Sequence, residues 1–445
     1  MTGPRRHAAA PVLELDDIQG PLLRRRPDDY HGIYLLYEIT DPATARESLR
    51  QALPEITSAA AWDTPRPFTL NVAFSYSGLK AIGLPADSLA SFPEEFRAGM
   101  AARSAVLGDT GPDHPGGWRE PLGSSSVHVG VLIIASAEEA LAEPVKIASE
   151  LRGVRIIDQL PVGVPETGRE HFGFRDGIGG PYIIGGTDEP LPGHDPVMPG
   201  EFILGYEDET GKIPNMPSPD TLGRNGTFMA FRQLSCDVAA FRRFLREHSR
   251  TPDEEELMAA KMVGRWRSGA PLALSPDTDD PELGADPRRN NNFAYYDQDL
   301  HGQRVPPGCH IRRINPRDAL KDSVVDVKIH RLIRSGAAYG PVLPEGVLED
   351  DGVERGIIFI FMGASLSRQF EFIQQVWIND GGFIGMGAEK DPISGNNDES
   401  QSFFTFPAKP VRRRLKGLPA FTRVRGGEYL FLPGISALQW ICSIR

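Results

Sequence analysis

The chain has only three cysteines among its 445 residues, Cys236, Cys309 and Cys442, and it has no Cys-x-x-Cys pair. This scarcity excludes a disulfide framework and a zinc ribbon, and it favours a reducing compartment. No run approaches the roughly 18 apolar residues that a membrane helix needs, and the N-terminus lacks the apolar core of a signal peptide. We therefore expect a cytoplasmic protein with no membrane partner, whose residues 1–17 form a flexible leader.

Positive charge is also in deficit. The sequence contains 48 Lys and Arg against 60 Asp and Glu, which gives a net charge of −12. Nucleic-acid binding depends on neutralising phosphates, so this balance excludes nucleic acid as a partner. The short clusters at 24–26 and 412–414, each of three arginines, are interpreted as solvated faces. The usual catalytic signatures are missing too, because no GxSxG elbow, HExxH pair, Walker A loop or strand-borne GxGxxG occurs.

What the chain does contain is two passes of alternating strands and helices. Period-2 and continuous apolar runs mark the strands, and Gly, Pro and Asp clusters bound them. In the first pass we expect strands over 31–39, 68–76, 127–136 and 154–162, and helices over 42–53 and 138–152. In the second we expect strands over 226–234, 309–315, 329–336, 357–363 and 429–434, and helices over 237–248 and 365–380, with 437–442 closing the chain.

This order predicts an α+β fold made of two ferredoxin-like βαββαβ domains, each an antiparallel sheet covered by helices. The first domain would span residues 18–225 and include a Gly/Pro-rich excursion, and the second would span residues 226–445.

Two segments differ from ordinary loop or core. In EHFGFRDGIGG (170–180), glycines flank an Arg and an Asp, so the backbone can approach a ligand closely while Asp176 projects from it. In CHIRRINPRDAL (309–320), Cys309 and His310 would face opposite sides of a strand. A single histidine on a strand is more often a core residue than a ligand, but the arginines at 312, 313 and 317 favour an anion nearby.

Together these segments resemble the dye-decolorising peroxidases, a family of haem enzymes. Gly173-Phe174-Arg175-Asp176-Gly177 matches the family's GxxDG signature, and residues 310–317 look like its segment with the proximal haem histidine. Residues 331–334 with Tyr339-Gly340 resemble the distal-arginine segment, and Asp17-Ile18-Gln19-Gly20 matches the N-terminal signature. The resemblance spans nearly the whole chain in the right order, and the length is similar to that of the longer, cytoplasmic members.

The resemblance implies the catalytic and cofactor-binding residues. Asp176 would take a proton from hydrogen peroxide and return it to the leaving oxygen, and Arg334 would stabilise the charge that develops as the O–O bond breaks. His310 would be the proximal ligand of the iron of haem b, with Asp391 as the acid behind its ring. His171 and Arg317 would lie near haem propionates. His330 remains a rival ligand, since on a strand it would share a face with Arg334.

The function implied is a peroxidase that oxidises bulky aromatic reductants, such as anthraquinone-type dyes and phenols, through a high-valent iron intermediate. The alternatives are a haem carrier or sensor, and a protein that decarboxylates or dechelates porphyrin on the same fold. Encapsulin is not expected as a partner, because the chain stops at residues 443–445 without a cargo peptide. The sequence leaves the oligomeric state, the physiological reductant, manganese oxidation and any surface Trp or Tyr relay open.

Overall fold

Two four-stranded antiparallel sheets organise the protein. The computed structural model describes residues 11–62, 66–408 and 410–444. The N-terminal sheet contains β1 (His31–Ile39), β2 (Phe68–Phe74), β3 (Val129–Ala135) and β4 (Val154–Gly163). The C-terminal sheet contains β7 (Thr227–Cys236), β8 (Ile333–Tyr339), β9 (Gly356–Gly363) and β12 (Thr422–Leu432).

The two sheets have the same internal order. The N-terminal sheet runs β4-β1-β3-β2 and the C-terminal sheet runs β12-β7-β9-β8, so in each the fourth strand lies beside the first and the third lies between the first and the second. This is the ferredoxin-like arrangement, and the predicted α+β fold of two such units is confirmed.

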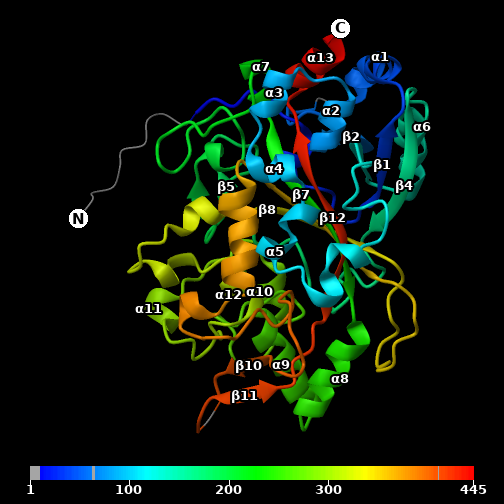
Figure 1. Ribbon diagram of the computed structural model, residues 1–445. Helices are drawn as coiled ribbons and strands as arrows, with labels where there is room; N and C mark the ends of the chain where they lie inside the picture. The colour runs from blue at the N-terminus through cyan, green and yellow to red at the C-terminus, as the bar shows by residue number, and fades with distance from the viewer. Residues whose placement is uncertain (1–10, 63–65, 409, 445) are drawn as a thin grey trace.

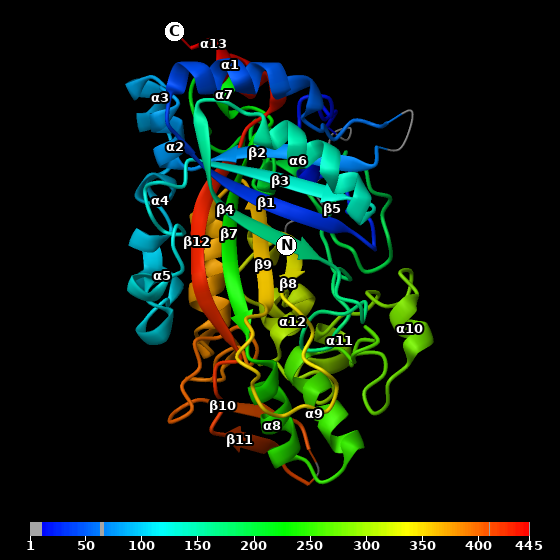
Figure 2. The ribbon, with the colours of Figure 1, turned by 90° about the vertical axis from the view of Figure 1, so that its right-hand side faces the viewer.

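The sheets meet at both edges and close an eight-stranded barrel. Each junction is a single residue pair, Phe431 with Phe74 between β12 and β2, and Gly163 with Ala338 between β4 and β8. Figure 2 shows the N-terminal strands crossing the upper part of the molecule while β12, β7, β9 and β8 run down its long axis. The barrel is thus two well-paired halves joined by two narrow seams.

Continuous apolar strands arise because both faces of the barrel are buried. On β9, Ile358, Ile360 and Met362 point into the barrel interior, where they pack with residues such as Met229 of β7. Alternate positions face outward, and Phe361 packs there under the covering helices. One set of alternating residues therefore forms the core inside the barrel. The other set faces outward, where it can pack against helices or line a cavity.

Helices cover the outer faces. The helices of the N-terminal half are α1 (Pro42–Ala52), α2 (Tyr76–Ala81), α3 (Ala86–Ala90), α4 (Glu94–Ala98), α5 (Ser104–Leu107) and α6 (Ala142–Ser149). Those that follow are α7 (Asp220–Gly223), α8 (Val238–His248), α9 (Pro252–Val263), α10 (Pro281–Ala285), α11 (Tyr296–Asp299), α12 (His310–Ile314) and α13 (Ile435–Ser443). Two short sheets, β5 (Tyr182–Ile183) with β6 (Pro196–Val197) and β10 (Phe403–Phe406) with β11 (Arg413–Lys416), lie outside the barrel.

Several element predictions need correction. Residues 309–315 are not a strand but the short helix α12, which ends before Pro316 because proline restricts the preceding residues. The helix expected over 365–380 is π-helical, over Leu366–Glu371 and Ile373–Ile378. The closing segment 437–442, for which no element was predicted, lies in the helix α13.

Residues 11–17, which were expected to belong to a flexible leader, contact the body of the protein. Leu13 is buried, and the Glu14 carboxylate accepts hydrogen bonds from Arg224 and Asn225. Asp17 accepts hydrogen bonds from the first N–H groups of α13. Residues 1–10 of the expected leader lie outside the described residues. No helix in the described ranges is both long and apolar enough to cross a membrane.

The barrel contains a carboxyl group whose ionisation should control stability. Glu428 of β12 is buried and accepts one hydrogen bond, from the Gly123 N–H at 2.6 Å. Burial raises the pKa of Glu428 to about 8, although the Gly123 N–H acts to lower it. Between pH 4.5 and 8 the unfolded chain therefore releases this proton while the folded protein keeps it, and stability falls as the pH rises.

We expect the substitution Glu428→Gln to make the unfolding free energy less dependent on pH. The parent protein should lose about 3 to 4 kcal/mol of unfolding free energy between pH 5 and pH 8 through this group, and the variant should not, because an amide has no charge to bury. Denaturant unfolding at the two pH values measures the loss, with the exposed Glu143→Gln on α6 as the control. If the unfolding free energy of the Glu428→Gln variant fell with pH as steeply as that of the parent protein, Glu428 would not be the group that causes the dependence.

Candidate active site

A cavity of about 1150 Å³ lies against the C-terminal sheet. The sheet contributes outward-facing residues of all four strands, namely Leu234, Arg334, Gly336, Ile357, Phe359 and Val424. Other walls come from α12 and from the π-helical segments, through Ile311, Ile314, Phe370, Ile373 and Ile378. From β9, Ile357 and Phe359 of the outward face line the cavity, and Ile360 and Met362 of the inner face line it as well.

His310 reaches the cavity from the start of α12, and Asp391 lies behind its ring. The His310 Nδ1 is 2.9 Å from Asp391 Oδ2, and Asp391 Oδ1 accepts hydrogen bonds from the N–H groups of Ile393 and Ser394 at 2.8 and 2.9 Å. Asp391 is fully buried, which acts to raise its pKa, but His310 and the Ser394 N–H outweigh burial and hold the pKa below its usual value. With Nδ1 bonded to a carboxylate, Nε2 is the ring nitrogen left for a ligand in the cavity.

The helical geometry of α12 separates the neighbours of His310 from the cavity. Cys309 is fully buried in another cluster, where burial raises the pKa of its thiol to about 12. Arg312 pairs with Asp299 at 3.2 Å, and Arg313 donates to four backbone carbonyls. These two arginines were expected to favour an anion, but both are occupied by structural partners, and only Arg317 of the three lines the cavity.

Asp176 and Arg334 lie together at the same cavity. Arg334 stands on β8 and donates to the Gly179 carbonyl at 3.0 Å, while Asp176 accepts from the Gly177 N–H at 2.7 Å. Burial lowers the pKa of Arg334, and the nearby Asp176 carboxylate partly offsets this. A Cβ atom at Gly336, two residues after Arg334, would lie 3.5 Å from Asp176 Oδ2, an ordinary contact distance that shows how closely the carboxylate approaches β8.

The turn that presents Asp176 is held by Glu170, a residue that sequence reasoning did not single out. The Glu170 carboxylate accepts from the N–H groups of Phe172 and Phe174 at 2.9 and 2.8 Å. Gly173 sits between them at φ +91°, where a side chain would be strained and would meet Arg267. Burial raises the pKa of Glu170 to about 7. The local signal was present in the Glu-x-x-Gly spacing, but nothing in the pattern indicates which backbone groups such a carboxylate accepts from.

A group of cations occupies another part of the wall. Arg317 donates to the Gly193, Asn291 and Phe293 carbonyls, and both Arg317 and Arg265 donate to the Asn291 side-chain oxygen. Arg331 lines the cavity beside them. Burial and the neighbouring guanidinium groups lower the pKa of Arg265 to about 9 and that of Arg331 to about 10. Among the described residues no carboxylate is hydrogen-bonded to this group, so it is suited to an acidic ligand.

Comparison with known proteins agrees with this geometry. A family model described as the DyP dimeric alpha+beta barrel domain matches residues 17–151. A dye-decolorizing peroxidase of Mycena epipterygia is 33% identical over 480 residues, covering 97% of this chain and 88% of the relative.

The chain belongs to the dye-decolorising peroxidase family.

Solved structures extend the match. A fungal peroxidase of this family from Auricularia auricula-judae superimposes with a TM-score of 0.84 at 30% identity, covering 98% of this chain and 100% of that one. Another dye-decolorizing peroxidase, solved in complex with 2,6-dimethoxyphenol, superimposes with a TM-score of 0.85 at 30% identity, covering 97% and 100%. The predicted family is confirmed, and the chain resembles the longer, fungal type.

Dye-decolorising peroxidases are haem enzymes, and haem is the cofactor of this chain. The cavity suits haem, because it is lined by one histidine, by many apolar residues and by a group of cations able to pair with two carboxylates. No cluster of three or more His, Cys, Asp or Glu within the described ranges could hold a bare metal ion. A single histidine ligand is instead typical of iron held by a porphyrin.

Two histidines lie elsewhere in this peroxidase. His171 Nε2 donates to the Tyr339 carbonyl at 2.8 Å, and the ring is buried away from the cavity. His330 is the last residue of a 3-10 helix and does not lie on β8. Its ring stacks on Phe372 with the ring centroids 3.8 Å apart, and its Nδ1 hydrogen-bonds to the Arg368 carbonyl. Neither forms part of the described cavity wall. Of the three histidines considered as haem contacts, only His310 lines the described cavity, and the roles expected for His171 and His310 stay predictions.

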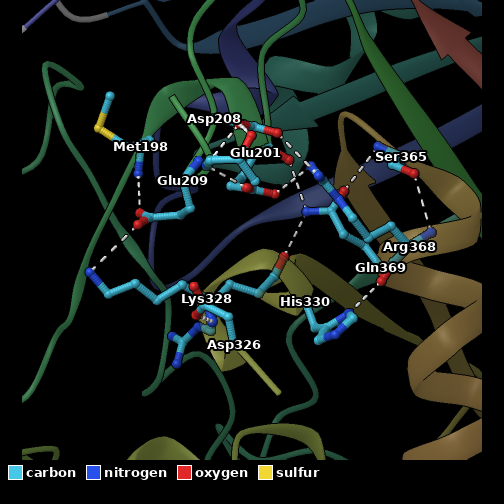
Figure 3. A network of polar contacts seen from close by, with 12 residues as sticks. Met198, Glu201, Asp208, Glu209, Asp326, Lys328, His330, Ser365, Arg368 and Gln369 are labelled. Atoms are coloured by element: carbon cyan, nitrogen blue, oxygen red, sulfur yellow. Dashed lines mark hydrogen bonds and ion pairs between the residues drawn. The ribbon is translucent and has the colours of Figure 1, made fainter. Parts of the chain in front are cut away.

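A buried polar network anchors the chain just before β8 (Figure 3). Arg368 forms ion pairs with Glu201 at 2.8 Å and Asp208 at 3.1 Å. Gln369 Nε2 donates to the carbonyls of Glu201 and Arg331, both at 2.8 Å. The network thus connects a π-helical segment and the loop before α7 to the backbone of Arg331. In this way it fixes the position of Arg331, which is one of the cavity cations.

Proposed function

We propose that this peroxidase uses Asp176 and Arg334 to activate hydrogen peroxide and His310, backed by Asp391, to hold the haem iron. The observation that carries the proposal is the arrangement of both pairs around one cavity with apolar walls. The reductants would be bulky aromatics such as anthraquinone-type dyes and phenols. One relative's structure holds 2,6-dimethoxyphenol, which supports a phenolic substrate.

Haem iron supplies the centre at which the O–O bond is broken. Asp176 would accept a proton from one oxygen of hydrogen peroxide and donate it to the other oxygen, which would leave as water when the O–O bond breaks. The Gly177 N–H leaves Asp176 Oδ2 as the oxygen free for this transfer. Arg334 would place a fixed positive charge beside the oxygen on which negative charge develops. Two phenols, each giving one electron and one proton, complete the reduction of one peroxide to two waters.

Asp391 would act through His310 rather than on the substrate. We expect Asp391→Asn to lower peroxidase activity by about 10-fold to 100-fold, the usual cost of removing the group behind a metal-bound histidine. Because a neutral amide makes the ring less anionic, the iron reduction potential should rise, which spectroelectrochemical titration measures. Ser394→Ala, which removes a longer contact of 3.4 Å to the same nitrogen, is the control. An unaltered potential in the Asp391 variant would contradict this role.

The absorption spectrum of the purified protein tests the proposed function. One equivalent of hydrogen peroxide should shift the haem bands, and 2,6-dimethoxyphenol or an anthraquinone dye should then restore them. Bands that peroxide leaves unchanged would favour a haem carrier or a porphyrin-modifying protein, neither of which needs the Asp176–Arg334 pair. A protein that takes up no haem on reconstitution would overturn the proposal.

We also propose a cytoplasmic location. The three cysteines are free and buried, which is compatible with a reducing compartment. Fractionation of the source cells with a compartment marker tests this, and recovery from the secreted fraction would contradict it.

A further inference from the structure

The cavity wall is far more basic than the protein as a whole. The chain carries a net charge of −12, yet the described residues that line the cavity include eleven arginines against six carboxylates. The arginines are residues 24, 25, 26, 66, 169, 175, 232, 265, 317, 331 and 334, and the carboxylates are residues 28, 109, 113, 170, 176 and 188. A concave wall with an excess of positive charge, inside a protein of negative net charge, focuses the field and concentrates anions.

Most of these arginines already have partners. Arg232 pairs with Asp109 at 2.6 Å, Arg25 pairs with Asp188 at 3.1 Å, and Arg175 donates to the Gly284 carbonyl. Arg26 donates to the Gly336 carbonyl at 2.5 Å and stacks on the Tyr30 ring at 4.2 Å. The cations at 265, 317 and 331 would be neutralised by haem propionates.

Two exposed arginines of the wall, Arg66 and Arg169, have no hydrogen-bond or ion-pair partner among the described residues, and the same holds for Arg24, which is half-buried. The Arg24 guanidinium lies 4.2 Å from the centroid of the Trp62 ring. Its Nε is buried with no hydrogen-bond partner in the described part of the chain, and burial is what lowers its pKa. Among the charged groups on this stretch of wall, Asp28 is exposed to solvent, and Arg25 is already neutralised by Asp188. A partly desolvated cation without a counter-charge is costly unless a ligand supplies one.

The site combines that cation with an aromatic surface. Trp62 offers a ring face, and Leu22, Phe68 and Ile134 are apolar residues that line the same cavity. A ring with an acidic substituent matches both features, because its ring can pack on the wall while its charge pairs with the guanidinium. A neutral phenol would use only the apolar part.

We propose that Arg24 and Trp62 form a binding site for aromatic carboxylates, and that this site selects phenolic acids as reductants of the peroxidase. The inference rests on the proposed function, since it names a substrate class for the same cavity.

A matched pair of ligands tests the site. 2,6-Dimethoxyphenol and 4-hydroxy-3,5-dimethoxybenzoate differ only by a carboxylate opposite the hydroxyl. Calorimetric titration of the haem-loaded protein without peroxide should show the carboxylate binding about tenfold more tightly than the phenol, the gain of roughly one charge-assisted hydrogen bond. Arg24→Gln should remove this difference and Arg24→Lys should retain part of it. The exposed Arg97→Gln on α4, which does not line the cavity, should leave it unchanged.

Steady-state kinetics give the second readout. In the Arg24→Gln variant, kcat/KM for the carboxylate should fall about tenfold, mainly through KM, while kcat/KM for the neutral phenol stays within about twofold. Raising the ionic strength should reduce the ratio of kcat/KM for the carboxylate to kcat/KM for the phenol in the parent protein. The same ratio in the Arg24→Gln variant should not change.

Three outcomes would overturn the inference: equal binding of the two ligands to the parent protein, an equal loss for both in the variant, or loss of haem from the variant, which would make Arg24 a propionate partner. Failure of the proposed function has a different signature, in which the carboxylate binds but neither compound is oxidised after peroxide is added.

Discussion

Arg334→Leu should slow the reaction with hydrogen peroxide about 100-fold while the haem stays bound, the cost expected when one fixed charge is removed from a developing oxyanion. The Arg334 guanidinium is aimed into the cavity by β8 and steadied by the Gly179 carbonyl, so leucine would remove the charge without disturbing the strand pairing. Asp176→Asn should cost a similar factor, because an amide of the same shape cannot accept the proton.

Stopped-flow mixing with peroxide measures both variants as second-order rate constants. Arg169→Leu is the matched control, because Arg169 also lines the cavity but is exposed on the approach to the Asp176 turn. If the Arg334 and Asp176 variants react as fast as the control, the pair does not activate peroxide and another group must supply the proton.

His310→Gly should abolish haem binding. The imidazole is the one side chain of the described cavity wall that offers a neutral nitrogen to iron, and the variant should retain less than about a tenth of the parent's haem. Added imidazole should enter the vacated space, bond to Asp391 and restore part of the occupancy. The ratio of haem absorbance to protein absorbance measures the result.

His301→Gly, a change at an exposed histidine outside the cavity wall, is the control for the His310 experiment. A His310 variant that keeps its haem, with unaltered spectra, would show that the iron is held by another residue.

Much of the barrel could be predicted because its signal is local. The strand runs of β1, β3, β7 and β9 are apolar on both faces, since one set of alternating residues packs inside the barrel and the other packs outward. Helices such as α8 begin at an Asp cap and keep one apolar face, so their bounds also follow from the pattern.

The errors come from elements too short to show a period. Helix α12 has five residues, fewer than two turns, so its apolar pattern resembles that of a strand. The same limit applies around His330, where a single 3-10 turn replaces the expected strand and redirects the ring toward Arg368. His310 was identified from its resemblance to the family and not from periodicity.

The cation group and the Glu170 turn could not be predicted for a different reason. Arg265, Asn291, Arg317 and Arg331 come from separate loops, and their common feature is a shared acceptor or a shared cavity. The spacing of these residues along the sequence does not indicate that they lie close together in the folded protein. Asp391 belongs to the same class, because its contact with His310 joins residues 81 positions apart.

The narrow seams of the barrel have a consequence for how the protein loses its cofactor. At the seam with β4, β8 makes one residue pair, and Arg26 and Tyr30 hydrogen-bond to its Gly336 carbonyl there. Thus β8, which carries Arg334, is one of the two edge strands of its own half, the other being β12. Sub-global opening should begin at this edge, where amide hydrogens exchange sooner than those of β9. Cofactor release would then require the C-terminal half alone to loosen, so haem loss on heating would report this local opening before the whole chain unfolds.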